Sequence, residues 1–208
     1  RVPSLKTVER FRDHVTGLGC EIPCDDLLKT DSSSPLVQPV QGVEVNGKTI
    51  GNRWAIHPME GWDGTTDGRP TDEVVRRWRR FGQSGAKLIY GCEAMAVRPD
   101  GRANPNQLII HARNQSALED LRETLVKAHF AKCGKADDLV IGFQLTHSGR
   151  FCRPHDKSKW EPRVAYRHPI LDRRFNVVSD DQVFTDGEIE SLIESYIEAA
   201  QVADNVGA

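Results

Sequence analysis

The stretch Leu139-Val140-Ile141-Gly142-Phe143-Gln144-Leu145, followed by Thr146-His147-Ser148-Gly149-Arg150, decides the fold class. Its first seven residues are apolar at nearly every position. This is typical of a strand in a parallel sheet, where both faces are covered. Polar residues follow this run directly, from Thr146 to Arg150. The pattern therefore predicts a strand of a buried sheet, with polar side chains that could bind a ligand at its carboxyl end.

The same pattern occurs twice earlier in the chain. In each case a short apolar strand is followed by a long loop and an amphipathic helix. The predicted units are strand 54–56 with helix 71–83, strand 86–90 with helix 116–130, and strand 139–145 with helix 185–204. Such an order predicts an α/β fold with a parallel sheet, and long loops after the strands are typical of a (β/α)8 barrel. Periodicity alone leaves an open doubly wound sheet as the alternative.

The segment ahead of these units has a different texture. Residues 4–19 have the apolar spacing of a helix, residues 25–39 are polar and predict a loop, and Asn46-Gly47 predicts the turn of a β-hairpin over 43–50. We therefore expect residues 1–50 to form a helix, a loop and a hairpin, and residues 51–208 to form the barrel part.

Composition excludes several classes of protein. The chain has 28 basic and 30 acidic residues, a net charge of −2, which favours neither nucleic acid nor an anionic membrane as a partner. No apolar run approaches the roughly 20 residues of a membrane span. The five cysteines form no disulfide framework, and the seven histidines show no metal-ligand spacing. We expect a cytoplasmic protein with reduced thiols and no metal site.

Three blocks at the predicted strand ends resemble, in order, the strand signatures of the old yellow enzymes and related NADH:flavin oxidoreductases. They are Asn52-Arg53-Trp54-Ala55-Ile56-His57-Pro58-Met59, then Gly85 to Val97 with Asp100-Gly101-Arg102, then Gly142 to Arg150. No GxGxxG or GxxxxGK[ST] follows a strand, so the sequence gives no support to a nucleotide-binding loop of those kinds.

The resemblance implies a TIM barrel that holds FMN at the carboxyl ends of its strands. Such an enzyme takes hydride from NADH or NADPH and passes it to a small-molecule acceptor, commonly an activated alkene beside a carbonyl. The implied cofactor contacts are the backbone of Pro58, Met59 and Glu60 along the isoalloxazine edge, and Ala94, whose small side chain leaves room for the ring. Gln144 is implied to bond the pyrimidine edge, and His147 matches a further position of the third block.

Only the first three strand–helix units of the barrel are predicted in this sequence. The resemblance places the substrate-binding pair and the phosphate-binding residues beyond Ala208, so we expect a truncated chain that is inactive alone. If the chain were the whole product, we would expect weak flavin binding, or self-association into a homo-oligomer that covers the open sheet edge.

Other interpretations stay open at this point. One is a flavin-free barrel fragment that serves as an interaction module, and another is a barrel hydrolase or aldolase that uses Glu93 and His147. Read singly, Glu93 predicts a carboxylate in a salt bridge, Cys92 a small core residue, and His57 a structural packing residue.

Overall fold

A computed structural model describes residues 1–208, which divide into two compact units, Arg1–Gln38 and Pro39–Ala208. The first unit contains helix α1 (Val8–Gly17), which begins after Thr7 because the Thr7 hydroxyl accepts a hydrogen bond from the Arg10 backbone N–H. This confirms the predicted helix, although it is shorter at both ends than expected.

The predicted hairpin is confirmed and lies in the second unit. Strands β1 (Glu44–Val45) and β2 (Lys48–Thr49) pair antiparallel across Asn46 and Gly47, which both adopt positive φ angles, 51° and 72°. Two positive φ angles in a row are what a two-residue hairpin turn requires, and asparagine and glycine adopt them readily.

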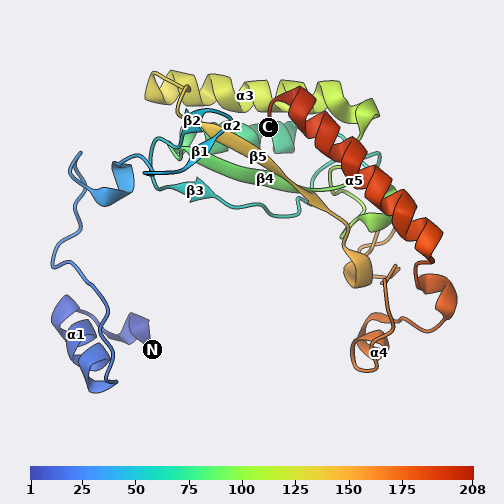
Figure 1. Ribbon diagram of the computed structural model, residues 1–208, viewed down its shortest axis with the longest axis horizontal. Coiled ribbons are helices and arrows are strands. Elements are labelled where there is room, and N and C mark those ends of the chain that lie inside the picture. Colours follow the sequence, from blue (N-terminus) through green and yellow to red (C-terminus); the bar gives the residue numbers. More distant parts are fainter. The chain divides into compact units, whose positions relative to one another are not determined.

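The second unit is built on a three-stranded parallel sheet in the order β3-β4-β5 (Figure 1). The strands are β3 (Ala55–Ile56), β4 (Leu88–Ala96) and β5 (Val140–Thr146). Asn52 connects the start of β3 to β4: its amide donates to the Gly85 carbonyl at 2.9 Å and accepts from the Lys87 N–H at 3.1 Å. The α/β class and the parallel sheet are therefore confirmed.

Strand β4 is longer than the sequence predicts. The predicted strand ended at Tyr90 and the following loop began at Glu93, whereas the strand continues to Ala96. The residues from Gly91 to Ala96 are all buried. A charged residue such as Glu93 favours a loop when the sequence is read alone. In the structure Glu93 stays in the buried strand because it forms an ion pair with Arg77.

Three long helices cover one face of the sheet (Figure 1): α2 (Asp72–Gln83), α3 (Gln115–Cys133) and α5 (Asp186–Val206). Thr71 caps α2, and Thr185 with Glu188 forms the predicted capping box of α5. The hydrophobic core lies between these helices and the sheet, and its largest fully buried members include Trp78, Ile89, Met95, Leu121 and Leu125. None of the helices is both long and apolar enough to cross a membrane.

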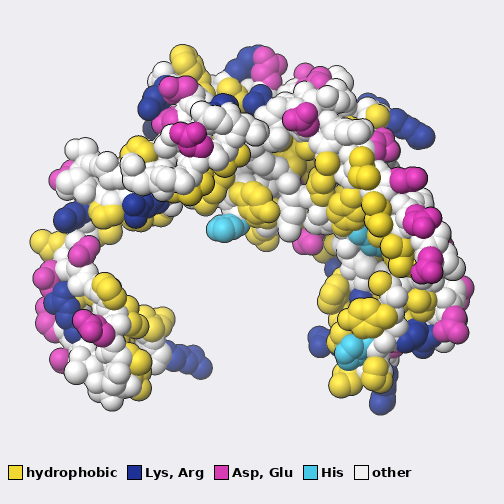
Figure 2. Space-filling model, in the orientation of Figure 1, with side chains coloured by type: hydrophobic (Ala, Val, Ile, Leu, Met, Phe, Trp, Pro, Cys, Tyr) yellow, Lys and Arg dark blue, Asp and Glu magenta, His cyan; other side chains and the backbone are white.

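The opposite face of the sheet carries no helix. Tyr90, which alternates with the buried Ile89, is 48% exposed, and only the first two residues of β5 are buried. Hydrophobic side chains accordingly lie open to solvent on the side facing the viewer in Figure 2. The expectation that the third strand is buried on both faces is therefore wrong for these residues, because helices pack on one side only.

The helix pair α2 and α3 gives a stability prediction. Gly82 of α2 lies so close to α3 that a Cβ atom there would overlap the Leu125 carbonyl oxygen. We expect Gly82→Ala to lower the free energy of unfolding by about 1–3 kcal/mol through overpacking. The control is Gly187→Ala in α5, where nothing lies within 4 Å. That change should be neutral or stabilising by up to about 1 kcal/mol. Equal shifts of the two urea unfolding midpoints would contradict the close packing.

Candidate functional site at the carboxyl ends of the strands

A bulge in β4 shapes the carboxyl ends of the sheet. Tyr90 pairs with Gly142 and Ala94 pairs with Gln144, so four steps along β4 match two along β5. Paired residues lie on the same face of the sheet, and Gly142 and Gln144 are two residues apart in β5 and so share a face. Tyr90, Ala94 and Gln144 therefore all lie on one face, the face without helices. Gly91 forms the bulge with a φ angle of +74°, a backbone conformation that residues other than glycine rarely adopt.

Gly91 brings two predicted cofactor residues together. A Cβ atom built on Gly91 would lie 2.5 Å from the Pro58 Cβ and 3.2 Å from the Gln144 Cβ. Pro58, after β3, and Gln144, in β5, therefore flank Gly91 from the two neighbouring strands. The missing side chain of Gly91 allows this close approach at the carboxyl edge of the sheet.

The backbone after β3 continues alongside β4 past the end of the regular strand. The Ala94 N–H donates to the Met59 carbonyl at 3.0 Å, while the Met59 side chain is 75% exposed and Glu60 is exposed as well. Ala94 itself is 3% exposed, so a larger side chain there would require its neighbours to move. The structure thus brings Pro58, Met59, Ala94 and Gln144 to one edge, with Glu60 next in the chain.

Gln144 has a free amide. Its side chain is half-buried and makes no hydrogen bond within the chain, so both its N–H donors and its carbonyl acceptor are available. A neutral amide at this position can pair with a heterocycle that presents a donor beside an acceptor.

His147 lies elsewhere. Its ring packs against Gly101 and meets the Phe184 ring edge-on, with centroids 5.5 Å apart. Its Nδ1 accepts from the Gly149 N–H at 3.1 Å, which leaves the proton on Nε2, a buried atom without a partner. The structure does not bring this imidazole into contact with Pro58 or Gln144.

Two buried polar residues near the site, Gln107 and Arg102, were given no role from the sequence. Gln107, which is fully buried, donates to the Ala94 carbonyl at 2.7 Å and accepts from the Ala103 N–H at 2.7 Å. Arg102 donates to the carbonyls of Thr66, Pro105 and Pro154, so it connects the loops that follow all three strands. The signal in the sequence is a run of amides, Asn104, Asn106 and Gln107, but polarity alone does not reveal burial.

The interpretations of Glu93 as a carboxylate in a salt bridge and of Cys92 as a small core residue are confirmed. Glu93 is 1% exposed and forms an ion pair with Arg77 of α2, and Cys92 belongs to the hydrophobic core. Burial raises the pKa of Glu93 to about 7, against the opposing effect of Arg77. His57 is exposed, so its predicted packing role is wrong. Glu93 and His147 have separate partners, and this gives no support to an acid–base pair between them.

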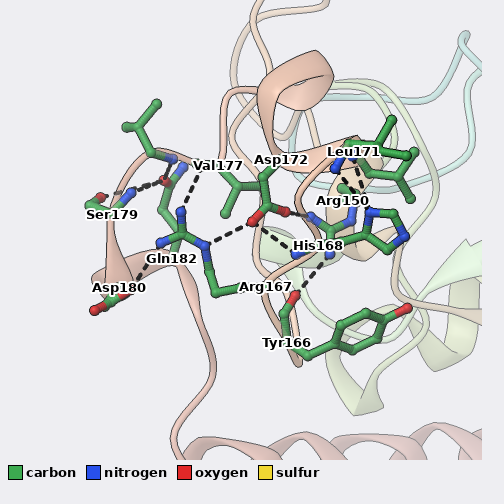
Figure 3. Close-up of polar contacts among 12 residues, drawn as sticks. Arg150, Tyr166, Arg167, His168, Leu171, Asp172, Val177, Ser179, Asp180 and Gln182 are labelled. Carbon is green, nitrogen blue, oxygen red and sulfur yellow. Dashed lines mark hydrogen bonds and ion pairs between the residues drawn. The ribbon is translucent and has the colours of Figure 1, made fainter.

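The long segment after β5 is held together by its own ion pairs (Figure 3). Asp172, in the short helix α4 (Leu171–Phe175), lies between Arg150 and Arg167 and accepts from the His168 N–H at 2.9 Å. Arg153 stacks on two indole rings, with its guanidinium 4.5 Å from the Trp160 centroid and 5.2 Å from that of Trp62. The segment is thereby attached to the loop after β3.

The close packing at Gly91 predicts a difference between two glycines with similar φ angles. Gly85, with a φ angle of +80°, has no neighbour within 4 Å, so Gly85→Ala should cost about 1 kcal/mol of unfolding free energy from backbone strain alone. Gly91→Ala adds the overlap with Pro58 and should cost about 1–3 kcal/mol more. Denaturant unfolding of the two variants tests this, and an equal loss in both would contradict the close approach.

His147 predicts a dependence of stability on pH. Burial lowers its pKa below the ordinary value of 6.5, so the unfolded chain takes up a proton more readily than the folded one. The contribution of His147 to stability is therefore present above pH 6.5 and is lost as the pH falls below that value. His147→Asn keeps an acceptor for the Gly149 N–H but does not titrate. Between about pH 7.5 and 5.5 the variant should lose less unfolding free energy than the wild type.

Comparison with known proteins gives structural matches only. No family model and no curated protein sequence matches the chain. Among solved structures, 2-naphthoyl-CoA reductase in complex with 2-naphthoyl-CoA is 18% identical with a TM-score of 0.61, over 83% of this chain and 26% of that one. The old yellow enzyme from Pichia sp. AKU4542 is 19% identical with a TM-score of 0.59, over 81% of this chain and 42% of that one.

A third match is morphinone reductase in complex with tetrahydroNAD, which is 23% identical with a TM-score of 0.55, over 84% of this chain and 47% of that one. The chain thus spans less than half the length of the structures that it matches. At these identities the similarity concerns the fold, and it agrees with the three strand-end blocks in the sequence. The chain has the fold of a part of the old yellow enzyme homologues.

Proposed function

We propose that this chain is part of an FMN-dependent NAD(P)H oxidoreductase of the old yellow enzyme type. In this proposal residues 51–208 are the first three strand–helix units of a (β/α)8 barrel, and the small-molecule acceptor is an activated alkene or a related compound. The main support is the close packing at Gly91, which brings Pro58 and Gln144 together at the carboxyl edge of the sheet. This edge is where barrel enzymes hold their cofactors.

The residues at this edge fit a flavin. The unpartnered amide of Gln144 offers a donor and an acceptor to the N3–H and carbonyl of the pyrimidine ring. The backbone from Pro58 to Glu60 would follow the ring edge, with the Met59 carbonyl already bonded to Ala94 and therefore fixed in place. Bound FMN would supply the hydride chemistry, and these residues would orient it.

The packing of His147 between Gly101 and Phe184 favours a supporting role, in which it holds the loop after β4 against the segment before α5. The proposal assigns the residues that bind the acceptor and the FMN phosphate to other parts of the whole protein. It also assigns the protein to the cytoplasm, where NADH and NADPH are supplied and the five unpaired cysteines would stay reduced.

The proposal predicts a visible chromophore. The whole protein should be purified with bound FMN, lose its yellow colour anaerobically with NADH or NADPH, and regain it when an α,β-unsaturated ketone or thioester is added. The regain reports hydride transfer to the acceptor. A whole protein that is colourless and gains no flavin absorbance from added FMN would rule the proposal out and favour a flavin-free interaction module.

A second prediction concerns the Gln144 amide. Gln144→Ala should weaken FMN binding by about 2- to 10-fold, which is the effect of losing one or two hydrogen bonds. Gln83→Ala is the matched control, because Gln83 is an exposed glutamine on α2. Fluorescence titration with FMN measures both affinities, and the same affinity in both variants would contradict the assigned contact.

A further inference from the structure

Resting on the proposed function, we propose that Glu93 is a positioning residue for the flavin. Together with Arg77 it fixes the peptide of Gly61, and so holds the segment from Pro58 to Gly61 against the cofactor. Glu93 does not contact the flavin in this proposal.

The bulge in β4 turns the Glu93 side chain toward α2 and the loop after β3. The carboxylate pairs with the Arg77 guanidinium, which also bonds Asp63, with 2.9 Å between Nη2 and Oδ1. Arg77 is partly exposed, whereas Glu93 is almost fully buried at one wall of a cavity of about 710 Å³. One arginine thus holds a carboxylate from β4 and another from the loop.

Gly61 is held from both sides. On one side its backbone lies against the Glu93 carboxylate, where the Gly61 N–H acts to lower the pKa of Glu93, and on the other side its carbonyl accepts from the Asn104 amide at 2.9 Å. A Cβ atom at Gly61 would lie 2.6 Å from the Glu93 Oε1, so a side chain there would force the peptide or the carboxylate to move. The Gly61 peptide is therefore held by β4 and by the loop after it.

The contacts on either side of Gly61 complete the fixation. Two residues earlier the Met59 carbonyl accepts from Ala94 in β4, and two residues later the Asp63 carbonyl accepts from the Thr71 hydroxyl that caps α2. Glu60 lies between fixed peptides, so its backbone is held although its side chain is exposed. This is the segment that the proposed function assigns to the flavin edge.

Stability alone does not explain a buried carboxylate at this position. Removing a charged pair from water costs free energy, and apolar residues of similar volume are often as stable or more stable. Burial raises the pKa of Glu93 to about 7, which reflects that cost. The carboxylate provides what an apolar side chain lacks, an acceptor for the Gly61 N–H.

Three variants of the whole protein test this. Glu93→Met removes the acceptor at similar volume and should weaken FMN binding roughly tenfold, as expected for about one lost hydrogen bond, and shift the flavin absorption bands. Glu93→Gln keeps an acceptor and should restore FMN affinity to within about threefold of wild type. The control, Asp138→Asn, breaks the ion pair of Asp138 with Lys87 at the opposite ends of the strands. It should lower stability but leave FMN affinity and absorption unchanged.

A flavin-independent measurement separates this inference from the proposed function. The Gly61 amide should be protected from hydrogen exchange in the wild type and in Glu93→Gln, and should exchange at least about tenfold faster in Glu93→Met. If the wild type binds no FMN, the proposed function fails, while Gly61 protection still reports the positioning.

Unchanged FMN affinity and absorption in Glu93→Met, with only stability lowered, would overturn the inference. If that variant does not fold, Gly61→Ala displaces the same peptide and should weaken FMN binding in the same way. Wild-type FMN affinity and absorption in Gly61→Ala would overturn it equally.

Discussion

The bulge in β4 is the constraint on which the rest of the site depends. Gly91 can adopt a φ angle of +74° because it has no side chain, and the same absence lets Pro58 and Gln144 approach from the neighbouring strands. The bulge also lets Glu93 leave the regular pleat and reach Arg77. The bulge at this one glycine therefore underlies both the approach of Pro58 to Gln144 and the ion pair on the helix side.

The loops at the carboxyl edge are fixed by buried polar side chains bonded to backbone. Arg102, Asn104 and Gln107 each donate to carbonyls of other segments, so the loops after β3, β4 and β5 are attached to one another. A buried backbone carbonyl without a partner is costly, and these side chains remove that cost without regular secondary structure. A rigid edge of this kind suits a cofactor that must be held in one orientation.

The core and the site lie on opposite faces of the same sheet. Helices α2, α3 and α5 cover one face with Trp78, Leu121, Leu125 and their neighbours, which stabilises the strands. The other face presents Tyr90 and Gln144, which stay accessible. Residues that stabilise the fold and residues that face the proposed cofactor therefore alternate along the strands, as the pleat of a β-strand requires.

The sequence by itself determined the order of elements, the helix caps and the hairpin, because these depend on neighbours within a few residues: Thr71, the Thr185–Glu188 box, and Asn46-Gly47. It also located the strand ends with Pro58 and Gln144. Only the tertiary structure decided that β4 continues through Glu93, that His147 turns to Phe184, and that Gln107 is buried. Each of these depends on partners distant in sequence, such as Arg77 for Glu93, whose proximity no local pattern encodes.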